Sequence, residues 1–147
     1  MRVEVTRDQS QETTFVEIHC REITNEVERL RKYISDFGMG IKAFEGGETH
    51  IVTLDKILYI ESVDKKTFIY TKNKVFATDK RLYELEDLLD KRDFFRCSKS
   101  VIINLNKVTK LRPEITRNIL ATLDNGEVIV VSRRYAAELK KLLKIGE

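Results

Sequence analysis

Short apolar runs follow one another from Ile41 to Val131, and residues typical of turns separate most of them. The separators include the pair Gly46-Gly47 and the run Asp124-Asn125-Gly126, which is typical of a tight hairpin turn. Short runs bounded in this way predict β-strands, and their spacing predicts antiparallel β structure. The predicted strands are 41–44, 50–54, 57–61, 67–71, 74–77, 101–103, 108–111, 118–123 and 127–131.

Two predicted helices interrupt and close this series of strands. Thr78 is expected to cap the first, which runs through the leucines of 82–89. Ser132 is expected to cap the second, whose apolar residues in 135–143 share one face. The fold class is therefore mostly β with short helices (α+β), and residues 41–147 are expected to form one domain.

Residues 1–40 are expected to be a separate extension of two strands and a helix. The segments 3–7 and 14–20 alternate apolar with polar residues, which predicts a hairpin that turns in 8–13. From 21 to 37 the spacing of apolar residues changes to three and four, which predicts a helix ending at Gly38. The residues of this apolar stripe are Ile23, Val27, Leu30, Ile34 and Phe37.

The stripe has two interpretations. Packing against the protein's own sheet is favoured, because the pattern is short for a coiled coil. The alternative is the seam of a homodimer, which would suit DNA with paired half-sites.

Length and composition limit the class of protein. The chain has 147 residues, of which 41% are hydrophobic and 35% charged, and such a chain can fold as one ordinary domain. No apolar stretch reaches the roughly 18 residues that a membrane span needs, and the first residues do not read as a leader peptide. We therefore expect a soluble, cytoplasmic protein in which Cys20 and Cys97 are reduced thiols.

Catalytic motifs are missing from the sequence. It contains no GxxxxGK[ST], GxGxxG or GxSxG pattern, and His19 and His50 have no nearby partner for a metal ion. We expect no enzyme activity, cofactor, metal ion or small-molecule substrate. Cys97 could be a reactive thiolate beside Arg96 and Lys99, but a small buried side chain is the favoured interpretation.

Positive charge is concentrated in the later part of the chain. Residues 1–50 carry seven Lys or Arg and ten Asp or Glu, a net charge of −3, whereas 51–147 carry twenty and fourteen, a net charge of +6. Cations at the expected joints between elements can contact phosphates or base edges, although solvated surface charge is the competing explanation. No helix-turn-helix is predicted, so loops would have to enter the grooves of DNA. The cations in these connections are Lys65, Lys66, Arg96, Lys99, Arg133 and Arg134.

Three motifs in 42–144 resemble the LytTR DNA-binding domain of bacterial transcription regulators. They are ILYIES at 57–62, DFFRCSKSVIINLNKV at 93–108 and LDNGEVIVVSRRY at 123–135. The resemblance implies an elongated set of antiparallel β-sheets with short helices. It also implies sequence-specific binding of double-stranded DNA, with loops placed in successive major grooves.

The resemblance implies DNA contacts in the same three connections between elements. The first loop contributes Lys66 and Thr67 beside Lys65, and the last contributes Arg133 and Arg134. The middle loop contributes Lys99, flanked by Ser98 and Ser100. The resemblance assigns structural roles to Arg96 and Asn104. Many members have His where this chain has Ser98, and the first loop often has His or Arg at the place of Thr67.

The resemblance extends to partners. Well-known members carry a receiver domain, for which 147 residues leave no room, so this chain resembles the short stand-alone regulators. Several of those are restrained by a membrane-bound inhibitor protein, and that partner is implied here by resemblance. The alternative function is a protein-interaction or anti-regulator module that keeps the fold and has lost DNA binding.

Overall fold

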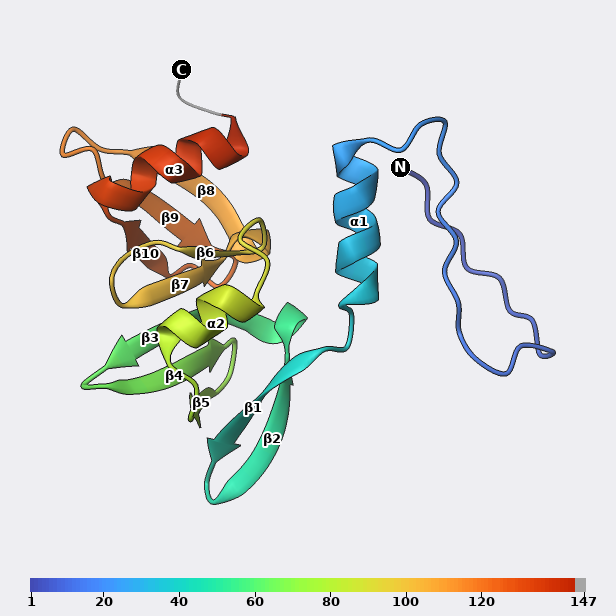
Figure 1. The fold of residues 1–147 in the computed structure, drawn as a ribbon, viewed down its shortest axis with the longest axis horizontal. Coiled ribbons are helices and arrows are strands. Elements are labelled where there is room, and N and C mark those ends of the chain that lie inside the picture. Colours follow the sequence, from blue (N-terminus) through green and yellow to red (C-terminus); the bar gives the residue numbers. More distant parts are fainter. Residues whose placement is uncertain (145–147) are drawn as a thin grey trace. The chain divides into compact units, whose positions relative to one another are not determined.

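A computed structural model describes residues 1–144 of the chain. It divides into two units, Met1–Phe37 and Gly38–Glu147, which are described separately below (Figure 1). Among the described residues, no helix is both long and apolar enough to cross a membrane.

The N-terminal unit contains one helix, α1 (Asn25–Ser35). Thr24 caps it, because its Oγ1 accepts a hydrogen bond from the Val27 N–H at 3.3 Å. Residues 1–24 contain no strand, so the predicted hairpin strands 3–7 and 14–20 are not observed. The turn between them is present, with the Gln11 N–H donating to the Asp8 carbonyl at 3.1 Å. Alternation alone does not make a strand, since a ladder also needs a face to pack against.

No residue of Met1–Phe37 is buried. The stripe on α1 is at most half-buried, and Ile23 and Phe37 at its ends are 74% and 72% exposed. Packing of this stripe against the protein's own sheet, the favoured interpretation, stays a prediction.

The second unit is built on a seven-stranded antiparallel sheet with the order β2-β1-β5-β4-β3-β7-β6 (Figure 1). Its strands are β1 (Gly40–Glu45), β2 (Glu48–Thr53), β3 (Ile57–Val63), β4 (Lys66–Thr71), β5 (Val75–Thr78), β6 (Phe94–Arg96) and β7 (Val101–Asn104). Two short 3-10 turns, Leu54–Lys56 and Leu105–Lys107, precede β3 and follow β7. β3 and β7 lie toward one side of the sheet, and residues 57–60 of β3 and 101–104 of β7 are all buried.

A second antiparallel sheet of three strands has the order β10-β9-β8. Its strands are β8 (Val108–Pro113), β9 (Ile119–Leu123) and β10 (Val128–Val131), and α3 (Arg133–Leu143) follows directly. The predicted Asp124-Asn125-Gly126 turn is confirmed, and Gly126 adopts φ 91° there, a conformation that suits glycine.

Two hydrophobic cores hold this unit together. One joins β3 and β7 of the large sheet to the small sheet and α3, through residues such as Tyr59, Ile103 and Leu139. The other lies under α2 (Leu82–Leu88) and includes Ile60, Ile102 and Leu85. β3 and β7 contribute to both cores, which explains why the runs 57–60 and 101–103 are apolar without interruption.

The structure corrects two predicted details. Thr78 does not cap α2; it ends β5 and its hydroxyl donates to the Lys42 carbonyl at 3.0 Å. The helix begins after Arg81, whose N–H donates to the Glu84 carboxylate at 3.0 Å. The strand β6 was not predicted, because its three residues become a strand only by pairing with β7.

Candidate nucleic-acid interface

The hairpin between β3 and β4 presents the first pair of cations. Val63 pairs with Lys66, so the turn consists of Asp64 and Lys65 alone. Both have positive φ, 51° and 67°, which is the pattern of a type I′ turn. The guanidinium of Arg81, the residue that precedes α2, donates to the Lys65 carbonyl at 3.3 Å and supports the turn. Lys65 and Lys66 are both exposed.

Thr67, the third residue expected in this loop, lies inside the sheet. It pairs with Ser62 of β3 and Thr78 of β5 and is 3% exposed. Its side chain therefore lacks the exposure that a contact with DNA requires, and its place in the sheet gives it a structural role.

The loop between β6 and β7 is organised by one guanidinium. Arg96 donates from Nε to the Ser98 carbonyl at 2.8 Å and from Nη2 to the Lys99 carbonyl. Its Nη1 donates to the carboxylate of Glu86, on α2, at 3.1 Å. Because these bonds engage all three nitrogens of the guanidinium, Arg96 shapes the loop.

The side chain of Lys99 is exposed at the tip of this loop, while Ser98 and Ser100 are half-buried. The Ser98 hydroxyl accepts from the Ser100 N–H at 3.3 Å, a local turn. Asn104 also has the structural role that the family resemblance implies, since its amide donates to the Ile57 carbonyl at 2.8 Å inside the core.

Burial defines the state of Cys97. The thiol is fully buried, and this burial raises its pKa to about 12. The adjacent Arg96 opposes the shift but does not cancel it. The interpretation as a small buried side chain is confirmed, and a reactive thiolate is not supported.

The start of α3 presents the third pair of cations. Ser132 occupies the N-cap position as predicted, although its side chain makes no capping hydrogen bond. Arg133 and Arg134 follow in the first turn and are exposed, and no acidic residue accompanies them there. Cations at this end oppose the helix dipole, whereas an anion bound there is stabilised.

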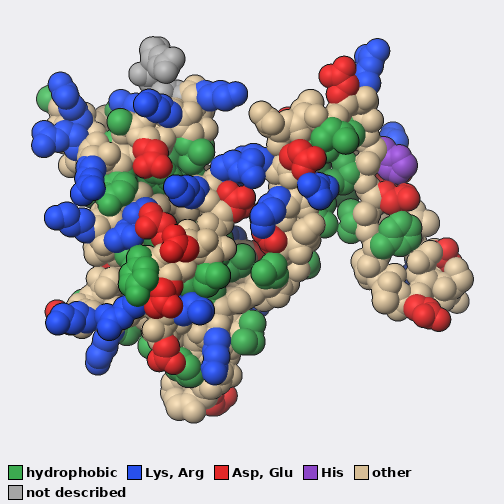
Figure 2. All heavy atoms as spheres, in the orientation of Figure 1, with side chains coloured by type: hydrophobic (Ala, Val, Ile, Leu, Met, Phe, Trp, Pro, Cys, Tyr) green, Lys and Arg blue, Asp and Glu red, His purple; other side chains and the backbone are tan. Residues whose placement is uncertain are grey.

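Backbone hydrogen bonds join the three sites. The Ser132 N–H donates to the Cys97 carbonyl at 2.9 Å, which ties the start of α3 to the β6–β7 loop. The Ser62 N–H donates to the Ser100 carbonyl at 2.8 Å, which ties the same loop to the end of β3. The β3–β4 turn, the β6–β7 loop and the start of α3 therefore lie along one edge of the second unit, and Figure 2 shows Lys and Arg side chains gathered along its left side.

Arg117 is a further cation that the sequence reasoning missed. It lies in the turn between β8 and β9, is exposed and has φ 70°. The next residue, Asn118, accepts from the Arg133 N–H at 2.8 Å, so this turn adjoins the start of α3. The sequence does show Arg117 as a cation between two predicted strands. Its position beside the start of α3 follows only from the hydrogen bond that Asn118 accepts.

The described residues hold no group of three or more His, Cys, Asp or Glu side chains that could bind a metal ion. Within residues 1–144, no two helices follow one another across a tight turn, and the candidate cations lie in loops and at one helix start.

Comparison with known proteins supports the expected family. Residues 47–144 match the model of the LytTr DNA-binding domain. A solved LytTr DNA-binding domain from Bacillus cereus is 32% identical in sequence and superposes with a TM-score of 0.69, covering 73% of this chain and 98% of that one.

Two curated relatives have transcription or signalling names. The sensory transduction protein LytT of Bacillus cereus is 31% identical over 137 residues, which are 93% of this chain, and this chain spans 51% of that protein's length. An uncharacterised HTH-type transcriptional regulator of Staphylococcus aureus (strain NCTC 8325) is 26% identical over 99% of both chains. With the fold, the three motifs and the family match in agreement, the chain belongs to the LytTr DNA-binding domain family.

Proposed function

We propose that this protein binds double-stranded DNA in a sequence-specific manner and regulates bacterial transcription, with its loops in the major groove. The family supports DNA binding, and the relatives' names support regulation. The proposal for the groove rests on the shape of the interface, where a hairpin turn, a loop and a helix start project from rigid strands.

The observation that carries the proposal is where the cations lie. Lys65 occupies a left-handed position that favours glycine, and Arg133 and Arg134 oppose the dipole of α3. None of these placements stabilises the fold, so a ligand is the better explanation for them. A polyanion that binds along the edge would interact favourably with all of them.

We assign the contacts by exposure. Lys65, Lys66, Lys99, Arg133 and Arg134 are the proposed DNA contacts, and Arg117 joins them as a phosphate contact. Ser98 and Ser100 are half-buried and would donate from the loop edge. A protein-interaction or anti-regulator module would not need exposed cations along this edge. Their presence therefore favours DNA binding.

Selection of bound duplexes from a random pool, followed by a salt titration on the selected site, tests the proposal. Four phosphate contacts would give log K a slope of about −3.6 against log salt. Failure to enrich any sequence, or an affinity that does not change with salt, would contradict it.

Such a regulator would act in the cytoplasm, where bacterial DNA lies. The resemblance further leads us to propose a membrane-bound inhibitor protein as a partner, which co-purification of the tagged full chain with detergent-solubilised membranes would detect.

A further inference from the structure

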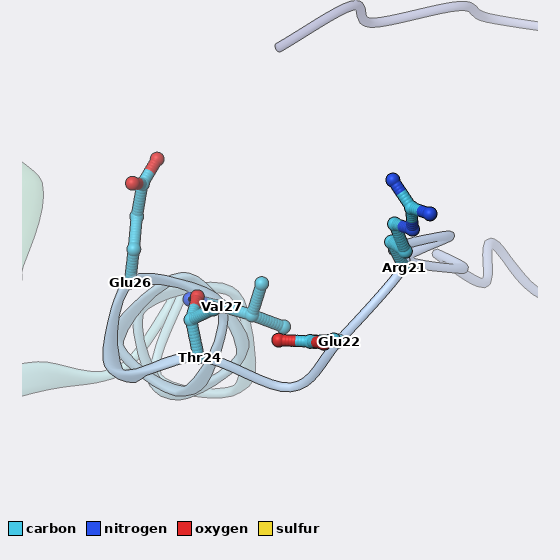
Figure 3. A pocket seen from close by; sticks show the side chains of 5 residues that line it. All are labelled: Arg21, Glu22, Thr24, Glu26 and Val27. Carbon is cyan, nitrogen blue, oxygen red and sulfur yellow. The ribbon is translucent and has the colours of Figure 1, made fainter.

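The helix α2 is linked by hydrogen bonds to two of the loops that carry proposed DNA contacts. The cap of a helix usually serves that helix alone. Figure 3 shows such a case at the start of α1, where Thr24 lies beside Val27, from whose N–H it accepts a hydrogen bond, and Glu26 points away from both. Charged side chains near the two ends of α2 instead take part in hydrogen bonds that reach the backbone of other elements.

Hydrophobic packing fixes α2 on the large sheet. Leu82 and Leu85, three residues apart, lie on one face of the helix, and both are buried in the core that includes Ile60 and Ile102. The helix contacts β3, β6 and β7, the strands that border the two loops. Because a close-packed core yields little, α2 provides a rigid point from which the loops can be held.

The contact in the last turn of α2 runs through Arg96. The Glu86 carboxylate accepts from Nη1 of Arg96 at 3.1 Å, and the side-chain exposures are 33% for Glu86 and 19% for Arg96. The other two nitrogens of Arg96 bond the carbonyls of Ser98 and Lys99. These carbonyls belong to the two peptide planes on either side of the Lys99 Cα, so holding both planes fixes the direction in which the Lys99 side chain leaves the loop. Glu86 therefore acts on Lys99 through the guanidinium that holds its backbone.

The contact at the start of α2 reaches the β3–β4 turn. Arg81 precedes the helix, and its N–H donates to the Glu84 carboxylate at 3.0 Å, which fixes the Arg81 backbone. Its Nη1 donates to the Lys65 carbonyl at 3.3 Å, in the peptide that joins Lys65 to Lys66. One short helix is thus linked to the backbone of both loops.

The charge of Glu86 is unfavourable beside a surface that binds a polyanion. An acidic side chain near DNA repels the phosphates and weakens binding. The hydrogen bond to Arg96 supplies a reason for an acid at this place, since a carboxylate is a strong acceptor for a guanidinium.

We propose that Glu86 and Arg81 are positioning residues for DNA binding. Through Arg96 and through the Lys65 carbonyl, they let α2 hold the β6–β7 loop and the β3–β4 turn at the spacing that one duplex requires. Neither residue needs to touch the DNA. The inference rests on the proposed function and adds to it an acidic residue whose removal should weaken binding to a polyanion.

Binding isotherms on the selected duplex test the role of Glu86 against its charge. Glu86→Ala should weaken binding about fivefold, the equivalent of one hydrogen bond, although it removes a negative charge. Asp87→Ala removes the same charge from the next residue, which is exposed, and should leave the affinity equal or slightly higher. Glu86→Gln keeps an oxygen that can accept from Arg96 and should bind more tightly than Glu86→Ala. Equal or tighter binding by Glu86→Ala than by the unaltered chain would overturn the proposal.

Double-mutant cycles show which lysine each positioning residue acts through. In a Lys99→Ala background, Glu86→Ala should cost less than about twofold, because no side chain is left to position. In a Lys65→Ala background it should keep its full effect. Arg81→Ala should show the reverse pattern, with its effect lost beside Lys65→Ala and kept beside Lys99→Ala. Additive effects within the pairs Glu86–Lys99 and Arg81–Lys65 would overturn the proposal.

Amide hydrogen exchange without DNA separates this inference from the proposed function. Glu86→Ala should speed exchange at Cys97 and at Ser62, whose N–H donates to the Ser100 carbonyl, while exchange across β4 and β5 stays unchanged. Faster exchange throughout the sheet, or unchanged exchange at Cys97 and Ser62, would overturn the positioning role. Failure of the unaltered chain to bind any duplex would contradict the proposed function, and the exchange measurement would still decide whether α2 holds the loop.

Discussion

The Tyr59 hydroxyl donates to the Glu127 carboxylate at 3.0 Å and so bridges the two sheets of the second unit. Tyr59 lies in β3, which ends at the Lys65 turn, and Glu127 immediately precedes β10, which leads to Arg134. The Tyr59 ring stacks on Tyr70, with centroids 4.4 Å apart. This bridge therefore links the strands that lead to the first and third parts of the candidate interface.

Replacing Tyr59 with Phe should lower the free energy of unfolding by about 1 kcal/mol, the usual contribution of one hydrogen bond. Burial, then the bond to Glu127, raises the pKa of Tyr59 above its ordinary value of 10.0. The stabilisation is therefore complete below pH 10 and is lost as the pH rises further. Urea unfolding from pH 7 to 11 should show a steeper loss for the unaltered chain than for Tyr59→Phe, and parallel profiles would contradict this.

Replacing Lys65 with Gly should stabilise the fold while weakening DNA binding. Glycine removes the strain of a positive φ, for a gain of about 0.5 kcal/mol. The variant loses one cation, so the slope of log K against log salt should become shallower by about one unit.

Asp64→Gly is the matched control for that variant. It relaxes the same turn without removing a cation, and it also removes a negative charge. Its DNA affinity should be equal or higher. Equal weakening by both glycine variants would show that the turn conformation matters and the Lys65 charge does not.

Arg96→Lys should loosen the β6–β7 loop although the charge is kept. A lysine has no planar fork, so it cannot bond two carbonyls and Glu86 together. We expect a loss of about 1–3 kcal/mol in the free energy of unfolding and weaker binding to all duplexes. Arg112→Lys, on an exposed position of β8, should change neither, and an Arg96→Lys protein of normal stability would contradict the structural role.

Thiol labelling should separate the two cysteines. Cys20 is exposed and Cys97 is buried, and the pKa of Cys97 near 12 leaves almost no thiolate at pH 8. Iodoacetamide followed by mass spectrometry should modify Cys20 at least about a hundredfold faster. Comparable rates in the folded protein would restore the interpretation of Cys97 as a reactive thiol.

Sequence patterns predicted the strands of the second unit well, most clearly β3, which contributes to both hydrophobic cores. Runs such as 57–60 are apolar throughout, and turns such as that at Gly126 carry their own conformational signal. The predicted hairpin in 3–20 is absent because alternation does not supply a face to pack against. β6 was missed because pairing with β7 defines it.

The loop cations of the candidate interface can be listed from the sequence, but their arrangement in space cannot. Nothing in the spacing of Cys97 and Ser132 indicates that their backbones are hydrogen-bonded. The burial of Thr67 follows from its place between two paired strands, and the proximity of Arg117 to Arg133 follows from the hydrogen bond that Asn118 accepts; neither can be read from the sequence.

Replacing Arg134 with Ala and replacing Lys99 with Ala should weaken DNA binding in different ways. Arg134 projects from a rigid helix start, and an arginine fork can make two parallel bonds to guanine O6 and N7. Lys99 is a point charge on a flexible stem, which suits a phosphate. Arg134→Ala should cost about 1–3 kcal/mol on the selected site and relax specificity at one base pair. Lys99→Ala should weaken selected and scrambled duplexes alike and make the salt slope shallower by about one unit.

Arg134→Lys separates charge from base readout at the same position. It keeps the cation, so binding to scrambled duplexes and the salt slope should stay unchanged, but it lacks the fork and should lose specificity as Arg134→Ala does. Binding isotherms on selected and scrambled duplexes, with thermal melts to confirm folding, give the comparison. If Arg134→Ala weakens both duplexes by equal factors and Arg134→Lys restores both, Arg134 contacts phosphate only, and base readout must come from another residue along this edge.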